Sequence, residues 1–304
     1  MDVLLELTQG DILQLHNFYA KFQDSAPQIW NFLHSVLKWV ETNSNLIKIY
    51  ALNGQWFPDG TFIAILKFNC YEIYMHTMEK SCKRLVFALK HTKVIKWDID
   101  TVIYALHSDL QPHVIKTLRE LEIPICFVQD NSLWLNSADD GVLNIKSESL
   151  RLGADFYLGP LNESHANVIN EIWPYRYEGS EEYVRTIIEQ NGGIGIFRSN
   201  TAKQDELVAW VLKNGVGMLG LLQTKNEYKK MGLASWAVKA MCKKMLSENY
   251  IPMCTIALSN EASQKTFIKS GFKLFAKCCY IGIGTESSIA FDSEYDCGLT
   301  QLNC

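Results

Sequence analysis

The chain has 304 residues, of which 48% are hydrophobic, so it can bury substantial cores, and its length favours two domains. Its formal net charge of −4 argues against a nucleic-acid partner, because proteins that bind nucleic acid usually present a strongly basic surface. Its nine cysteines lack the paired spacing of zinc ligands, so we expect reduced thiols and no metal.

The N-terminal segment carries acids where a secretory signal would carry basic residues. The sequence also lacks an uninterrupted apolar run of about 18 residues, the length that a membrane-spanning helix needs. We therefore expect a cytoplasmic protein with no membrane partner.

The first half predicts a helix followed by strands. Apolar residues recur at intervals of three and four in residues 29–41, which is typical of one helix face. Later segments are rich in β-branched and aromatic residues, and Asn53-Gly54 and Asp59-Gly60 supply turns. The predicted strands are residues 47–52, 61–68 and 70–77, with a second helix at 113–121 and further strands at 125–128 and 133–136.

A polar stretch from Leu135 to Gly153 separates two halves of similar character. We place the domain boundary near residue 150. The predicted domains are residues 1–150 and 151–286, followed by a polar C-terminal tail at 287–304.

The second half begins with two predicted helices, at residues 164–173 and 180–191, opened by Ser164 and Ser180. An antiparallel meander follows, because Asn214-Gly215 is the dipeptide that a type I′ hairpin turn prefers. Its strands are residues 193–199, 206–213 and 217–224.

The stretch EYKKMGLASW, residues 227–236, places Gly232 where a strand gives way to a helix that runs to about Asn249. The first N–H groups of a helix lack intrahelical partners and carry partial positive charge, so they attract anions. Glycine allows close approach, Lys229 and Lys230 add charge, and small Ala234 and Ser235 keep the approach open. The stretch therefore predicts a site for a phosphorylated cofactor.

A second motif, SNEASQKTFIKSGF, follows the predicted strand at residues 253–258. Ser259 or Asn260 is expected to cap a short helix, and Gly271 to end it. The order of strand, anion-binding turn, helix, strand, short helix and GF pair resembles the GCN5-related N-acetyltransferase (GNAT) superfamily. Within it, LVAWVLKNGVGMLGLLQTKNEYKKMGLASW is most similar to the glycine N-acyltransferase family.

The resemblance implies a mixed α/β fold of two GNAT-like domains in tandem. The first is degenerate, because YALHSDLQPHVIKTL has no glycine and so no phosphate-binding turn. The implied co-substrate is acetyl-CoA or another acyl-CoA, whose pantetheine lies between two splayed strands. The implied cofactor contacts are Leu222, Thr224, Lys229, Lys230, Met231, Gly232, Leu233, Ala234, Ser235 and Asn260.

The implied activity is acyltransferase: acyl transfer from coenzyme A to a small amine by direct attack, with glycine or another amino acid as acceptor. Glu227 is the candidate general base, and the competing interpretation is an exposed carboxylate that balances Lys229 and Lys230. Two alternatives stay open, and two departures from the family favour the first of them: Lys229 replaces Arg or Gln, and Phe267 replaces a tyrosine acid. These alternatives are a non-catalytic acyl-CoA-binding protein and a protein N-acetyltransferase. The family resemblance also leaves a mitochondrial location open.

Overall fold

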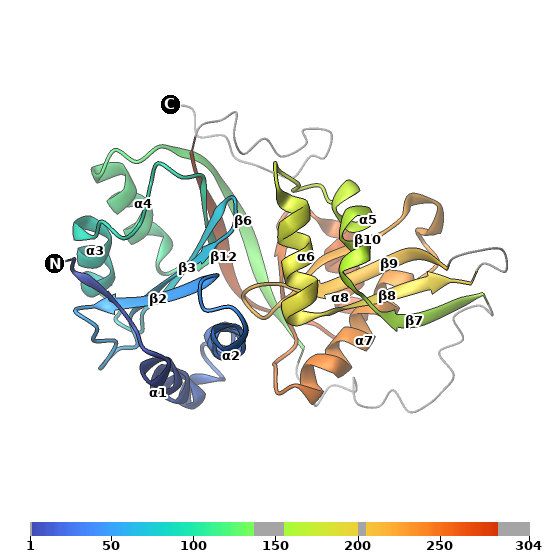
Figure 1. Cartoon of the computed structure of the whole chain (residues 1–304), viewed down its shortest axis with the longest axis horizontal. Helices are drawn as coiled ribbons and strands as arrows, with labels where there is room; N and C mark the ends of the chain where they lie inside the picture. The colour runs from blue at the N-terminus through green and yellow to red at the C-terminus, as the bar shows by residue number, and fades with distance from the viewer. Residues whose placement is uncertain (1, 137–154, 200–204, 285–304) are drawn as a thin grey trace. The chain divides into compact units, whose positions relative to one another are not determined.

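The computed structural model describes residues 2–136, 155–199 and 205–284. It divides into two compact units, and both contain helices and strands, which confirms the predicted mixed α/β class (Figure 1). The boundary expected near residue 150 and the tail at 287–304 lie outside the described residues. No helix in the described ranges is long and apolar enough to cross a membrane.

The first unit contains a mixed sheet with the strand order β1-β2-β3-β4-β5-β12-β6. Its strands β4 and β5 are parallel, and β1 to β4 pair antiparallel in chain order. The strands are β1 (Leu4–Glu6), β2 (Ile47–Leu52), β3 (Phe62–Lys67), β4 (Tyr71–His76), β5 (Thr101–His107), β6 (Ile125–Leu135) and β12 (Lys273–Ile283).

The helices described in this unit are α1 (Gln9–Tyr19), α2 (Pro27–Thr42), α3 (Lys83–His91) and α4 (Gln111–Glu120), with a 3-10 turn η1 (Ala20–Phe22) after α1. The core on one face joins α3 and α4 to the sheet through Leu85, Leu118, Ile73 and Ile103. Helices α2 and α4 match predicted helices, whereas α1 and α3 were not predicted.

The first unit also includes β12, from the far end of the chain. Residues from Ala276 belong to it, and β12 pairs antiparallel with β5, with Cys278 opposite His107. Cys279 and Ile281 are buried in the first unit's core. A Cβ at Gly282 would lie 2.1 Å from the Phe127 ring, so only glycine fits there. The compact units therefore do not each consist of one continuous stretch of the chain.

The second unit has the strand order β6-β11-β10-β9-β8-β7, with the last three residues of β6 at one edge. Strands β7 to β10 pair antiparallel, and β10 and β11 are parallel. The strands are β7 (Phe156–Pro160), β8 (Gly193–Arg198), β9 (Glu206–Lys213), β10 (Leu219–Thr224) and β11 (Met253–Ala257).

The described part of the second unit also contains the α-helices α5 (Ala166–Glu171), α6 (Ser180–Asn191), α7 (Leu233–Ser247) and α8 (Glu261–Lys269) and the 3-10 turns η3 (Glu163–His165) and η4 (Asn226–Tyr228). Helices α5 and α6 lie in front of the strands in Figure 1. Helix α7 packs on the sheet through Ala237, Val238 and Met241, against Ile196 and Val211.

The hairpin between β9 and β10 forms, but the expected two-residue turn at Asn214-Gly215 is wrong. Residues 214–218 make a longer loop in which Gly217, not Gly215, has a positive φ of 76°. The Asn214 side-chain oxygen accepts hydrogen bonds from the backbone N–H groups of Val216 (3.2 Å) and Met218 (3.0 Å). These two bonds stabilise the wider loop.

A buried histidine gives the first unit a pH dependence that can be measured. His76 is 8% exposed, and burial lowers its pKa to about 3, so the folded chain keeps it neutral while the unfolded chain takes up a proton below about pH 6.5. The contribution of neutral His76 to the free energy of unfolding is complete above pH 6.5 and is lost as the pH falls from 6.5 towards about 3.

We expect urea unfolding of the unsubstituted chain to show a loss of stability between pH 7 and pH 5, of which His76 supplies about 2 kcal/mol. The variant His76→Gln should lose about 2 kcal/mol less over the same interval. Equal losses for both chains would contradict a neutral buried His76.

Candidate functional site

Strands β10 and β11 separate almost as soon as they meet. In the described part of the chain their pairing is limited to Leu219 opposite Cys254. On its other side β10 stays paired with β9, but its register shifts between Gly220 and Gln223, and Leu221 takes a φ of 49°. Residues 222–224 thus have backbone groups on the β11 side that no ladder uses. An extended ligand with amide groups can pair with such an edge.

The predicted pantetheine contacts lie on this free stretch. Leu222 and Thr224 are both partly buried, and Leu222 packs against the core under α7. The Thr224 hydroxyl oxygen is itself buried and has no hydrogen-bond partner in the described protein. A polar atom in that position favours a ligand that supplies the missing partner.

The chain then forms η4 and enters α7 through two residues with positive φ. Lys230 has φ 65°, and Gly232, which stands directly before α7, has φ 80°. No side chain caps this helix start, and a Cβ added at Gly232 would meet nothing within 4 Å. Glycine is needed here for its conformation rather than for packing, and the space above the free N–H groups is open.

The side chains around this helix start differ in exposure. Leu233 is buried in the core, Ala234 and Ser235 are half-buried, and Met231 is 52% exposed. Lys229 and Lys230 are exposed and form no ion pair with a described residue, whereas Lys225 lies 2.8 Å from Glu206. The predicted turn residues are thus brought together, with two unneutralised cations beside the helix start.

Glu227 lies in η4, next to the turn, and its side chain is exposed. It forms no ion pair with Lys229 or Lys230. The turn does not bury the Glu227 carboxylate.

Asn260 and Phe267 have structural roles in α8. The Asn260 side-chain oxygen accepts from the Ser263 N–H at 3.0 Å and so caps the helix, as predicted. Phe267 is 4% exposed and meets Phe272 edge-on at 4.9 Å, inside the core. Gly271, with φ 87°, ends α8 as predicted. Phe267 therefore contributes to core packing, and its side chain has no proton to donate to a leaving group.

The first unit has the same strand-to-helix step, but its helix start is filled. Strands β4 and β5 pair from Tyr71 to Ile73, and α3 follows β4 through Cys82, which has φ 51°. The Glu79 carboxylate accepts from the Arg84 N–H at 3.0 Å and from the Ser81 hydroxyl at 2.6 Å. A protein carboxylate thus occupies the place of an anionic ligand. The glycine-free stretch YALHSDLQPHVIKTL leads into α4, one helix after this turn.

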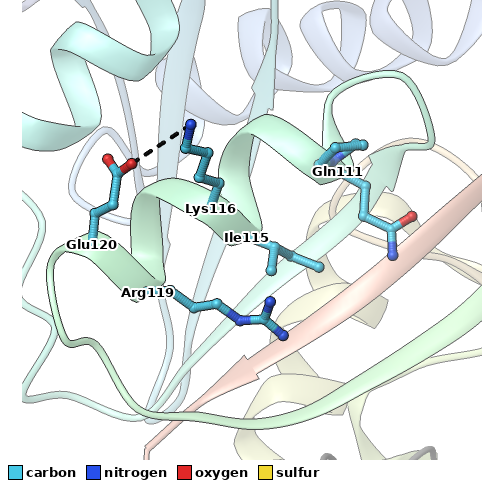
Figure 2. A pocket seen from close by; sticks show the side chains of 6 residues that line it. Gln111, Ile115, Lys116, Arg119 and Glu120 are labelled. Carbon is cyan, nitrogen blue, oxygen red and sulfur yellow. Dashed lines mark ion pairs between the residues drawn. The ribbon is translucent and has the colours of Figure 1, made fainter.

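The pocket drawn in Figure 2 belongs to the first unit. It has a volume of about 660 Å³, and all its lining residues come from α4, among them Gln111, Ile115 and Arg119. Lys116 and Glu120 approach to 3.9 Å on the same helix. Because no second element contributes a polar group, the pocket is a surface depression. The described residues contain no cluster of three or more metal-ligand side chains.

Comparison with protein-family models matches residues 193–281 to the FR47-like protein family and residues 3–117 to a domain of unknown function, DUF5645. A search of curated proteins gave no match. Among solved structures, a Drosophila protein is similar over 94% of this chain and 100% of its own, with 19% identity and a TM-score of 0.83.

A tandem GNAT protein from the clavulanic acid biosynthesis pathway is similar over 92% of this chain and 97% of its own, with 11% identity and a TM-score of 0.54. The chain therefore has the fold of GNAT superfamily acetyltransferases, and its two units are consistent with two GNAT-like domains in tandem, as predicted.

The role of Gly232 can be tested against a second glycine of the same kind. Gly232 and Gly271 both have φ near 80° at a helix end, a conformation that costs a residue with a Cβ about 1–2 kcal/mol. We expect Gly232→Ala and Gly271→Ala each to lower the free energy of unfolding by about 1 kcal/mol in urea titrations. An unchanged stability for Gly232→Ala would show that its left-handed backbone is not the constraint.

Proposed function

We propose that the chain is an acyl-CoA-dependent N-acyltransferase that moves an acyl group from coenzyme A to a small amine, with glycine or another amino acid as the acceptor. The observation that carries the proposal is the continuous path from the free edge of β10, at residues 222–224, to the open start of α7 at Gly232. One ligand with an amide-bearing arm and a pyrophosphate matches both ends of this path.

In this proposal the pantetheine amides pair with the backbone of β10, beside Leu222 and Thr224. The pyrophosphate lies against the N–H groups from Lys229 to Ala234, with the Ser235 side chain close by, where the helix dipole and Lys229 and Lys230 favour negative charge. Met231 and Leu233 contribute their backbone to this turn. Asn260 faces the pantetheine arm from α8 while it keeps its capping bond.

The reaction forms one bond and breaks one. The acceptor nitrogen attacks the thioester carbonyl carbon, a backbone N–H of β10 stabilises the negative charge on the oxygen, and the carbon–sulfur bond then breaks. The amine loses its proton to a base, for which Glu227 is our candidate. The departing thiolate takes a proton from water because Phe267 cannot supply one, and a thiol with a pKa near 8.5 leaves readily.

The small-amine acceptor rests on the motif resemblance rather than on geometry. The stretch from Leu207 to Trp236 is similar to the glycine N-acyltransferase family, with a tryptophan-bearing strand before the turn. Trp210, on that strand, is fully buried, and its indole N–H has no partner in the described protein.

A second candidate function is acyl-CoA binding without turnover. The exposed side chain of Glu227 and the core position of Phe267 favour it, because the candidate base is not enclosed and no acid stands where the family has a tyrosine. Both candidates require the same cofactor site, so binding is tested first.

We expect coenzyme A and acetyl-CoA to raise the thermal unfolding temperature, whereas NAD at the same concentration should not. Ligand at 100 times its dissociation constant adds about 2.7 kcal/mol of stability. Gly232→Ala should weaken this shift because a residue with a Cβ disfavours the left-handed backbone that leads into α7, and Gly271→Ala is the control with a similar backbone strain outside the turn. If no coenzyme A compound shifts the unfolding temperature at millimolar concentration, the proposed function is wrong.

A turnover assay distinguishes an N-acyltransferase from a protein that only binds acyl-CoA. With an acyl-CoA that binds and an amino acid acceptor, release of free thiol should be measurable, and Glu227→Gln should reduce kcat by about a hundredfold or more if Glu227 is the base. Glu171→Gln, which changes another exposed carboxylate of the second unit, is the control. Unchanged turnover and pH profile in Glu227→Gln would remove Glu227 from the mechanism.

A further inference from the structure

A side-chain network joins η4 to two neighbouring strands. Tyr228 is the last residue of η4 and directly precedes Lys229. Its hydroxyl donates to Glu206 Oε2 at 2.7 Å, at the first residue of β9, and accepts from Arg198 Nη1 at 3.2 Å, at the last residue of β8. The turn that precedes α7 is thus connected by one hydroxyl group to both strands.

Further contacts fix the same residue. The Tyr228 ring meets Phe156 of β7 edge-on, with ring centroids 6.0 Å apart, and its backbone N–H donates to the Lys225 carbonyl at 3.0 Å. Ring, hydroxyl and backbone of Tyr228 are therefore all held. Because Lys229 follows directly, the direction in which the chain enters the turn is set by Tyr228.

The network also includes Lys225, whose charge is paired with a carboxylate. Glu206 Oε1 accepts from Lys225 Nζ at 2.8 Å, and the hydrogen bonds from Lys225 and Tyr228 lower the pKa of Glu206 below its usual range. Glu206 thus remains charged and pairs with Lys225. The two following lysines, Lys229 and Lys230, have no described carboxylate partner and face solvent.

We propose that Tyr228 is a positioning residue for the pyrophosphate of coenzyme A, an inference that rests on the function proposed above. It acts through the turn: by holding η4 on β8 and β9 it keeps the N–H groups after Lys229 in one arrangement before the ligand arrives. A turn ordered in advance loses less conformational entropy on binding. The thioester end of the ligand lies along β10, so the chemical step does not depend on Tyr228.

The test is Tyr228→Phe, which removes the hydroxyl and keeps the ring. Dissociation constants are measured by calorimetry for coenzyme A, for 3′-dephospho-coenzyme A, which keeps the pyrophosphate, and for acetyl-pantetheine, which lacks it. We expect the first two to bind roughly threefold to tenfold more weakly and acetyl-pantetheine to bind as before. With acetyl-CoA as substrate, KM should rise by the same factor and kcat should stay unchanged.

The control is Tyr157→Phe, since Tyr157 on β7 also donates its hydroxyl to a carboxylate, that of Asp205, but does not lead into the turn. It should bind all three ligands as the unsubstituted chain does. If Tyr228→Phe does not fold, Arg198→Gln removes one bond to the same hydroxyl and should weaken binding in the same selective way.

The outcomes separate the two proposals. Failure of the unsubstituted chain to bind coenzyme A would overturn the proposed function. Binding of coenzyme A by the unsubstituted chain, with equal affinity in Tyr228→Phe, would overturn only the role of Tyr228. An equal loss for acetyl-pantetheine would also overturn it, because a general structural defect does not distinguish ligands with and without pyrophosphate.

Discussion

The parting of two parallel strands is the constraint on which the proposed site depends. Backbone N–H and C=O groups inside a sheet are almost always paired, so strands that separate must leave groups for another partner. In the second unit β10 leaves β11 after Leu219, and Leu221 takes a left-handed conformation that costs on the order of 1–3 kcal/mol. Pairing of Gly220 and Gln223 with β9 flanks this strained residue on the opposite side. The proposed cofactor site uses the edge of β10 that faces away from β9.

The same topology occurs twice with opposite outcomes at the helix start. In the first unit Glu79 supplies the negative charge that the start of α3 attracts, so the favourable electrostatic interaction is already made within the chain. In the second unit no side chain caps α7, and glycine replaces the buried Cys82 of the first. A carboxylate of the chain thus lies at one helix start, whereas the other helix start has no such partner among the described side chains.

Local signals in the sequence predicted the parts of the site that depend on local physics. The open helix start at Gly232 and the helix end at Gly271 follow from neighbouring residues and were predicted. Helix α1 was not predicted because His16 is one of its buried residues, which leaves the apolar face of the helix incomplete. Helix α3 was not predicted because Cys82, the residue before it, is not a residue type that usually caps a helix. The place of β12 in the first unit and the exposure of Glu227 depend on tertiary packing, which no local pattern contains.

The sizes of typical catalytic contributions indicate how much rate is lost when a residue of the family pattern is replaced, as at Phe267. A general acid or base contributes about 10² to 10⁴ in rate, whereas holding two reactants in a productive geometry is worth effective molarities of about 10⁵ to 10⁸ M. A thioester with a good leaving group depends on the first contribution less than most acyl donors do. The core position of Phe267 therefore removes only the acid from the smaller contribution, while in the proposed reaction the β10 edge and the α7 start supply the larger one. An arrangement of this kind can still transfer an acyl group, provided that the turn before α7 is held in place.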